Sequence, residues 1–392
     1  MHNRRARRAV LAAVLVVVVA GASFGVYTVI KGSPAKGANP GGNSHSSPAA
    51  PLLTVSGNKL MSSTGKPVRL IGVNLSGSRN CLFKYTQPFP APANSSTVSA
   101  LESWHVNAVR MTLNESCWFG IDGEPHAMSV AQYRGNIESL VPLLTAAHIE
   151  VIITLYANTI TTTTVKSAGG TPEQKRTPNT DPMADAAYGP KFWTSVATTF
   201  RGDAGVMFDL YNEPQNITWP CWENGCTVHG TKYVGMQQLV DAVRATGARQ
   251  PLLLGGVDFA TNLSGWLAHE PNDPDHDLVA SVHVYSQNPC HTPKCWTTTI
   301  GTLAKKIPVI TGEFGSKTCD SAEVQQYMKW SDKRNISYLA WAWTTGSCST
   351  TSGPLLANYA GAPSSFGSIY KSHLTALFQA GHGDIGTVTT RH

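Results

Sequence analysis

The sequence carries little charge and distributes it unevenly. Asp, Glu, Lys and Arg make up 14% of the 392 residues, and the first 50 residues contain no acidic side chain. Six of the 30 basic residues lie in those first 50, which leaves 24 basic against 24 acidic residues for the remainder. A nucleic-acid-binding domain needs a basic face on its folded part. The neutral remainder therefore gives no reason to expect a nucleic-acid partner.

Two further patterns are missing. No glycine-rich turn of the dinucleotide-binding type follows the first predicted strand, which argues against an open, doubly wound sheet. The pairs Cys221/Cys226 and Cys290/Cys295 have no histidines nearby at zinc-finger spacing, which favours disulfides over a metal site. The sequence therefore predicts neither a metal nor an organic cofactor.

Residues 1–31 have the composition of a targeting segment. Arginines at positions 4, 5, 7 and 8 precede an apolar run of 22 residues, from Ala9 to Ile30, which ends at Lys31. Small residues at 20–22 suit cleavage by signal peptidase, but the run is also long enough to remain as a membrane anchor. Both alternatives predict a secreted or membrane-anchored protein whose only contact with a membrane is through this segment.

The composition changes twice more along the chain. Residues 32–51 mix Gly, Ser, Pro, Asn and Ala, which is typical of a flexible linker. No second linker follows, so residues 52–380 are predicted to form one domain, and residues 381–392 a polar tail. We expect this domain to be a monomer.

Within residues 52–380, short apolar strand-like runs alternate with helix-like segments. This alternation is typical of parallel β-α-β units, and eight such units close into a (β/α)₈ TIM barrel. The segments 52–55 and 59–61 are expected to form a hairpin that plugs the floor of the barrel. The expected strands are 69–74, 108–113, 151–155, 206–211, 252–255, 278–284, 308–311 and 338–343, and the clearest helices are 129–147, 188–200, 231–246, 321–334 and 364–380.

The eight cysteines all follow predicted strands, and the loops after the strands of a barrel cluster at one end. An even number of cysteines in an extracytoplasmic protein is expected to pair. We expect two local loops and two links between neighbouring loops: Cys221–Cys226, Cys290–Cys295, Cys81–Cys117 and Cys319–Cys348.

Two glutamates end predicted strands at the same rim. The apolar run before Asn212-Glu213-Pro214 is the fourth strand, and proline cannot continue it beyond Glu213. Glu313 ends the seventh strand, so the two carboxylates are expected to face each other. Paired carboxylates are what glycoside hydrolysis needs, one as acid and one as nucleophile. Asp209, earlier on the fourth strand, is expected to face solvent or the helices. The other polar and aromatic residues expected at this rim are Arg110, Tyr156, Asn212, His283, Tyr285, Trp341 and Trp343.

These motifs resemble glycoside hydrolase family 5, the cellulase family of retaining (β/α)₈ glycosidases. Asn212-Glu213-Pro214 is similar to the family's acid/base motif, and Gly312-Glu313-Phe314-Gly315 is similar to its nucleophile motif. The resemblance covers about residues 52–380 and rests on six motifs in order. The remaining four are 70–74, Val109-Arg110-Met111, His283-Val284-Tyr285, and Trp341 or Trp343.

The resemblance implies roles for these residues. Glu213 is implied to be the acid/base, Glu313 the nucleophile, and Arg110 the group that orients Glu313. One strand 8 tryptophan is implied to lie under the sugar. Tyr156 departs from the pattern, because family members usually carry a histidine at the end of strand 3.

The predicted function is hydrolysis of a β-linked polysaccharide or oligosaccharide by a retaining, cellulase-like endo-β-glucanase. Two alternatives use the same scaffold, a β-mannanase and an exo-β-glucosidase. A third alternative is a barrel that binds carbohydrate without cleaving it.

Overall fold

The structure is a computed structural model that describes residues 50–77, 81, 88–121, 128–158, 160–166, 172–178, 181–348 and 353–381. The expected targeting segment, nearly all of the linker and the tail after Gly381 lie outside the described residues. None of the described helices has both the length and the apolar character needed to cross a bilayer.

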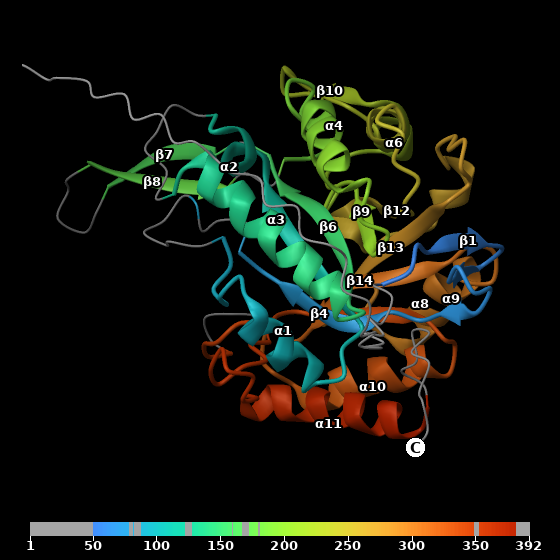
Figure 1. Ribbon diagram of the computed structural model, residues 1–392. Coiled ribbons are helices and arrows are strands. Elements are labelled where there is room, and N and C mark those ends of the chain that lie inside the picture. The colour runs from blue at the N-terminus through green and yellow to red at the C-terminus, as the bar shows by residue number, and fades with distance from the viewer. Residues whose placement is uncertain are drawn as a thin grey trace, which may run out of the picture. The chain divides into compact units, whose positions relative to one another are not determined.

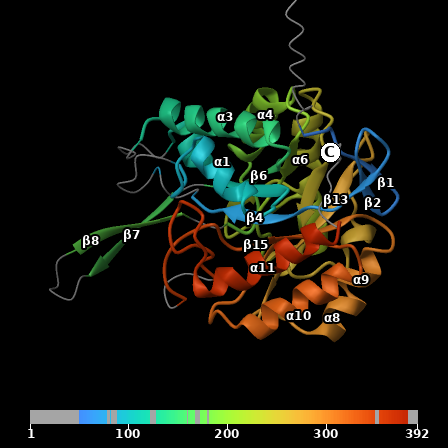
Figure 2. The same cartoon turned by 60° about the horizontal axis from the view of Figure 1, so that its bottom comes forward.

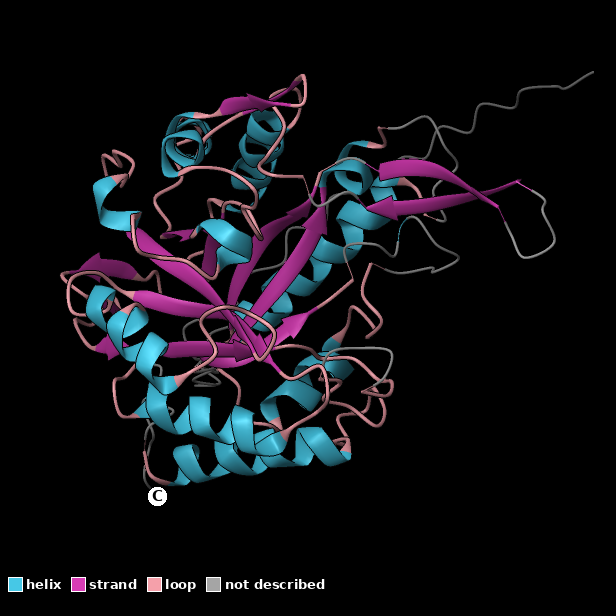
Figure 3. Ribbon diagram, turned by 180° about the vertical axis from the view of Figure 1, so that it is seen from behind, coloured by secondary structure: helices cyan, strands magenta, loops and turns pink. Residues whose placement is uncertain are grey.

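Eight parallel strands close into a barrel at the centre of the fold (Figures 1 and 3). They neighbour one another in chain order, and each corresponds to one predicted strand, so the expected TIM barrel is confirmed. The strands are β4 (Ile71–Leu75), β5 (Ala108–Asn114), β6 (Glu150–Ala157), β9 (Val206–Asp209), β12 (Leu252–Gly255), β13 (Leu278–Tyr285), β14 (Val309–Gly315) and β15 (Ser337–Ala340).

Seven of the eight barrel strands end one to four residues away from the prediction, and three of these shifts involve the predicted glutamates or tryptophans. β9 stops at Asp209, so Glu213 lies in the loop after the strand and not at its last position. β14 continues through Glu313 to Gly315, and β15 stops at Ala340, before both tryptophans that were expected on it.

Helices cover the outside of the barrel, and Figures 1 and 2 show the last two, α10 and α11, side by side. Apart from the partly exposed Tyr156, every residue of these strands is buried, because helices cover one face and side chains fill the other. The longer helices are α1 (Ser95–Glu102), α3 (Val130–Ala146), α4 (Gly189–Phe200), α6 (Met236–Arg244), α10 (Ser321–Asp332) and α11 (Ser365–Gln379). The short ones are α2 (Glu115–Phe119), α5 (Trp219–Asn224), α7 (Val257–Ala260), α8 (Pro293–Thr298), α9 (Ile300–Leu303) and the 3₁₀ turn Trp266–Ala268.

The N-terminal hairpin closes the floor of the barrel, as predicted. β1 (Thr54–Ser56) and β2 (Lys59–Met61) pair antiparallel, and β3 (Pro67–Val68) adds a third strand. Leu53, Leu60 and Val68 form one apolar cluster with the first inward-facing residue of each barrel strand, such as Met207 and Ile310. This cluster excludes water from the amino end, so the open end of the barrel is the carboxyl end.

Two further hairpins were not predicted. β7 (Ile160–Lys166) and β8 (Pro172–Pro178) follow β6 and extend away from the barrel in Figures 1 and 2. β10 (Cys226–Val228) pairs with β11 (Thr231–Tyr233), so the helix expected over 231–246 is wrong at its start. That helix begins at Met236, where the Gln238 side chain accepts the Gly235 N–H.

The four disulfides link Cys81 to Cys117, Cys221 to Cys226, Cys290 to Cys295 and Cys319 to Cys348, as expected. Close backbone packing also fixes the barrel. A Cβ on Gly72 would lie 1.7 Å from the Ala108 carbonyl oxygen, so β4 and β5 approach closely only because residue 72 is glycine. The Tyr370 hydroxyl of α11 donates to the Gly72 carbonyl at 2.6 Å, which anchors the last helix to the first barrel strand.

Candidate active site

A pocket of about 380 Å³ opens at the carboxyl end of the barrel and contains both predicted catalytic glutamates. Its volume falls in the range of about 300–1,000 Å³ that is usual for ligand sites. It is lined by Tyr156, Glu213, Phe259, Tyr285, Gln287, Asn288, Glu313, Lys317 and Trp341. The expected convergence of strands 4 and 7 on one rim is therefore present in the structure.

The two carboxylates lie close together, with His283 beside them. One oxygen of each glutamate and one ring nitrogen of His283 all lie within 4.8 Å of one another. His283 Nδ1 is 2.9 Å from Glu213 Oε1 and 3.8 Å from Glu313 Oε2. These three groups are also close enough to ligate a metal ion, but buried Arg110 already supplies a positive charge to Glu313 at 2.7 Å.

Glu313 is held by a partner on each oxygen. Arg110 Nη1 donates to Oε1 at 2.7 Å, and the Tyr285 hydroxyl donates to Oε2 at 2.8 Å. Both donors are buried, so each favours the ionised carboxylate in surroundings with little water. Burial and the neighbouring Glu313 charge raise the pKa of Tyr285 well above its ordinary value, which keeps the phenol protonated as a donor.

Arg110 uses all five of its N–H groups. Burial alone would lower the pKa of Arg110, but the charges of Asp209 and Glu313 raise it above its ordinary value. The guanidinium is therefore fixed in position and stays positively charged. Its acceptors are Asp209 Oδ2, Asn74 Oδ1, Glu313 Oε1, Thr154 Oγ1 and Asn212 Oδ1.

Asp209 does not face solvent or the helices as predicted. It is buried inside the barrel and accepts from Arg110 Nε at 2.7 Å. Side chains alternate along a strand, so Asp209 points the same way as Met207, which lies in the apolar floor cluster. The sequence held this signal, because a strand whose residue 207 faces inward must also turn residue 209 inward.

Glu213 has an environment unlike that of Glu313. Burial raises the pKa of Glu213 to about 7, although the positive charges of Arg110 and Lys317 oppose this. Burial also lowers the pKa of His283 to about 4. The imidazole is therefore neutral at pH 5–7, so its contact with Glu213 Oε1 adds no positive charge. Glu213 keeps 23% of its side chain exposed, and that part faces the pocket.

Asn212 is buried beside the two glutamates and has one free donor. Its Oδ1 accepts from Arg110 Nη2 at 2.8 Å, which fixes the orientation of the amide. Its Nδ2 has no hydrogen-bond partner among the described residues. The amide nitrogen of Asn212 is therefore a candidate donor to a ligand.

The two tryptophans that were predicted on strand 8 lie in different surroundings. Trp341 lines the pocket and stacks on Tyr156, with ring centroids 6.0 Å apart. Trp343 is fully buried and packs edge-on against Trp104, with centroids 4.9 Å apart, so its expected place in the substrate site is wrong. The reason is that the strand predicted over 338–343 ends at Ala340, so residues 341 and 343 do not share one face as they would on a longer strand.

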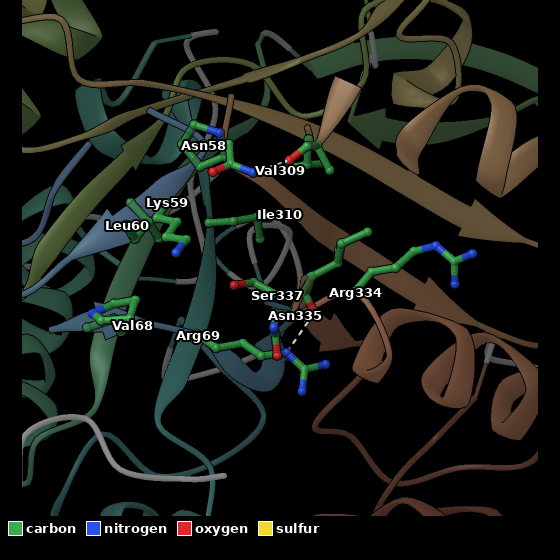
Figure 4. A pocket seen from close by; sticks show the side chains of 14 residues that line it. Asn58, Lys59, Leu60, Val68, Arg69, Val309, Ile310, Arg334, Asn335 and Ser337 are labelled. Atoms are coloured by element: carbon green, nitrogen blue, oxygen red, sulfur yellow. Dashed lines mark hydrogen bonds between the residues drawn. The ribbon is translucent and has the colours of Figure 1, made fainter. Parts of the chain in front are cut away.

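A second hollow, of about 370 Å³, lies at the amino end of the barrel strands, beside the N-terminal hairpin (Figure 4). Lys59, Arg69 and Arg334 contribute its charged groups, and the described residues that line it include no carboxylate. Without a carboxylate pair this hollow lacks the acid and the nucleophile that the sequence motifs predict, so the chemistry of the protein is assigned to the carboxyl end.

Comparison with known proteins agrees with this geometry. The model of the cellulase family, glycosyl hydrolase family 5, matches residues 61–347. The chain belongs to this family. The chain is 22% identical over 323 residues to the endoglucanase MaCel5A of Microbulbifer sp. (strain ALW1). That match covers 76% of this chain and 54% of MaCel5A.

Solved structures share the fold at low sequence identity. β-Glucanase SdGluc5_26A from Saccharophagus degradans superposes with a TM-score of 0.61 at 17% identity, over 84% of this chain and 95% of that one. The catalytic domain of Thermobifida fusca endoglucanase Cel5A gives a TM-score of 0.56 at 16% identity, over 83% and 97%. The identification thus establishes the barrel and the family, while the roles of individual residues depend on the geometry above.

Proposed function

We propose that the protein is a retaining endo-β-glucanase in which Glu213 is the general acid/base and Glu313 is the nucleophile. The observation that carries this proposal is the closeness of the two carboxylates, whose oxygens lie within 4.8 Å. Retaining glycosidases hold their carboxyl groups about 5–5.5 Å apart, and inverting ones about 6.5–9.5 Å. The short separation leaves no room for an attacking water between the two groups and favours direct attack by a carboxylate.

The different surroundings of the two groups support the assignment. Glu213, with a pKa raised to about 7 by burial, holds the proton that an acid must deliver. Glu313 accepts hydrogen bonds from Arg110 and Tyr285, which stabilise its charge and aim it. The two glutamates therefore divide the roles of acid and nucleophile by environment.

The proposed reaction has two steps. Glu213 protonates the glycosidic oxygen while a Glu313 oxygen attacks the anomeric carbon, and the carbon–oxygen bond to the leaving sugar breaks. Glu213, now ionised, takes a proton from water, whose oxygen attacks the glycosyl-enzyme and releases Glu313. The Nδ2 donor of Asn212 has no partner among the described residues, and we assign it to a sugar 2-hydroxyl, a contact that strengthens as positive charge develops on the ring.

Relatives indicate the substrate class. SdGluc5_26A is a β-glucanase that was solved in complex with cellotetraose, and MaCel5A is an endoglucanase. Trp341 supplies an aromatic face to the pocket, and aromatic rings pack against the C–H faces of pyranoses. We therefore expect a β-glucan chain in this pocket, with a β-mannan or an exo-acting specificity as the alternatives that a substrate panel distinguishes.

The test is turnover of an aryl β-cellobioside by wild type and by single variants. Glu313→Ala should show no turnover above background, and Glu138→Gln, which removes an exposed carboxyl from α3, should match wild type. Glu213→Ala with a dinitrophenyl leaving group should accumulate a covalent glycosyl-enzyme, detected by intact mass. Binding of glucan by wild type without any turnover would favour the non-catalytic alternative. Activity retained in Glu313→Ala would remove the proposed nucleophile.

We further propose that the protein acts outside the cytoplasm as a monomer, secreted or held by its N-terminal segment. The four disulfides support an oxidising compartment. Fractionation of producing cells into membrane and medium tests this, and N-terminal sequencing of the released form shows whether the segment is removed.

A further inference from the structure

The end of the barrel opposite the catalytic pocket carries unpaired positive charge. The hollow of about 370 Å³ beside the N-terminal hairpin is lined by Lys59, Arg69 and Arg334, and no described residue of its lining is a carboxylate (Figure 4). After residue 50 the sequence has 24 basic and 24 acidic residues, so the excess of one sign here is a local feature of a neutral chain. A local excess of positive charge attracts a negatively charged partner.

Two turns beside the hollow add further cations. The turn between α9 and β14 contributes lining residues and carries two lysines, and the turn between α10 and β15 carries a third directly before Arg334. We call the exposed cations of this region the basic sector, which consists of Lys59, Lys305, Lys306, Lys333 and Arg334. None of the five forms an ion pair with another described residue, whereas Arg69 is paired with Asp332 at 2.6 Å. The charge of the basic sector is therefore available to a partner.

The backbone segments that carry the basic sector are tied to one another. Asn58 Nδ2, in the N-terminal hairpin, donates to the Ala304 carbonyl at 2.8 Å, which joins the hairpin to the turn before β14. Arg69 Nε donates to the Ile336 carbonyl at 2.9 Å, which joins the end of the hairpin region to the turn before β15. The three segments therefore present their cations on one connected surface.

The chain enters the described part of the protein at the same end of the barrel. The Ala50 N–H donates to the Thr145 carbonyl at 2.7 Å, and a Cβ on Gly205 would lie 2.6 Å from the Ala50 Cβ, so Ala50 lies where β6 and β9 begin. Residues 32–51 have the composition of a flexible linker and follow the apolar run 9–30. A flexible chain of about 20 residues spans about 25 Å on average. A bilayer that holds the apolar run would therefore stay close to the amino end of the barrel.

We propose that the basic sector is a docking surface for the anionic phospholipid headgroups of the membrane that holds residues 9–30. This inference goes beyond the proposed hydrolysis and rests on the alternative in which the apolar run is retained as an anchor. Each lysine or arginine near an anionic membrane surface strengthens binding about 5-fold, so several together act as a second attachment. Docking would turn the amino end of the barrel to the bilayer and the catalytic pocket away from it, toward a polymeric substrate.

The experiment measures the reactivity of single lysines in the full chain. The oxidised protein is reconstituted in vesicles of phosphatidylcholine alone, or with about a third of phosphatidylglycerol, and its lysines are acetylated and quantified by mass spectrometry. Lys59, Lys305 and Lys306 should react about 3- to 10-fold more slowly on the anionic vesicles, and about 0.5 M salt should remove this protection. Lys191, at the start of α4, and Lys317, in the catalytic pocket, should react equally on both vesicles.

A pair of charge reversals tests whether the basic sector causes the protection. Lys305→Glu combined with Lys306→Glu changes two exposed residues outside the catalytic pocket. This variant should lose the protection of Lys59 and hydrolyse a soluble aryl β-cellobioside at the wild-type rate. Lys191→Glu combined with Lys232→Glu also reverses two exposed lysines, and it should keep the protection.

Four results would overturn the docking surface. They are equal reactivity of Lys59 on both vesicles, equal protection of Lys317, protection that survives the two reversals, and removal of residues 9–30 from the native protein. Protection of Lys59 by soluble glycerol phosphate on neutral vesicles would assign the basic sector to a free anion and also exclude the membrane role. The proposed hydrolysis is measured separately on the soluble substrate, so it stands or falls independently of these results.

Discussion

The raised pKa of Glu213 should make the active site a source of instability that depends on pH. Burial brings this pKa from an ordinary 4.5 to about 7. The folded state therefore binds the proton more tightly than the unfolded state does. Below about pH 4.5 Glu213 is protonated in both states, so the pKa difference costs no stability. Between these values stability falls as pH rises, and above about pH 7 the full penalty applies.

The size of this effect follows from the two pKa values. Their difference corresponds to about 3 kcal/mol, and the 23% of the Glu213 side chain that stays exposed reduces the expected penalty to about 2–3 kcal/mol. Glu213→Gln keeps the shape and the neutral state of the protonated acid. The variant should match wild type in stability at pH 4 and exceed it by about 2–3 kcal/mol at pH 8, while losing activity.

The assay is urea unfolding of the oxidised full chain at pH 4, 6 and 8, followed by tryptophan fluorescence. Glu138→Gln is the matched control for loss of one carboxyl, since Glu138 lies exposed on α3 far along the sequence from the site. A stability gain for Glu213→Gln that is the same at all three pH values, or larger at pH 4, would show that Glu213 carries no such penalty. It would then not be the group that holds a proton near neutral pH.

Three further predictions concern other residues around the pocket. Asp209→Asn keeps the shape of the side chain but removes a charged acceptor from Arg110. Steady-state assays on an aryl cellobioside should therefore show kcat lower by about 10- to 100-fold, the value of a charge-assisted hydrogen bond. An unchanged kcat would mean that Asp209 is only a packing residue. Trp343→Ala removes a fully buried ring and should cost about 3–5 kcal/mol of unfolding free energy. Trp341→Ala removes a ring that lines the pocket and should raise KM at unchanged stability. The reverse result would mean that the two rings have exchanged roles. Phe259 has a φ of 62°, in the left-handed region, so Phe259→Gly should raise the free energy of unfolding by about 1 kcal/mol in urea unfolding; lower stability would mean that the turn is not strained.

The barrel could be predicted from the sequence because its signals are local. Each barrel strand is a short apolar run, and Pro214 marks the break after Glu213. The disulfide partners also followed from position, since each pair lies within one loop or on neighbouring loops. The hairpin of β7 and β8 was missed because neither strand has an apolar pattern. β7 is rich in threonine, which is β-branched, but β8 is mostly charged and polar, with a proline at each end.

The parts of the site that were missed depend on geometry beyond the reach of local patterns. Trp343 was placed in the pocket by extending strand alternation past Ala340, where the strand has ended. Phe259 lines the pocket from a turn in which Asp258, Phe259 and Ala260 all adopt a left-handed backbone. Residues other than glycine rarely do so, and no sequence pattern predicts three of them in succession. The inward direction of Asp209 could have been predicted, because side chains two residues apart on a strand point the same way and Met207 faces inward.

Asp209 also sets the charge balance of the site. Five ionisable groups form the cluster in the site, and among them Arg110 carries one positive charge, and Asp209 and Glu313 carry one negative charge each. The other two are uncharged: His283 is neutral because burial lowers its pKa to about 4, and Glu213 holds its proton up to about pH 7. This cluster therefore has one negative charge in excess before reaction, which is compensated when the sugar ring becomes positive in the transition state. Without Asp209, Arg110 would neutralise Glu313 and the excess would vanish. Asp209, a carboxylate that never touches the substrate, thus makes the charge of the nucleophile Glu313 available to the substrate.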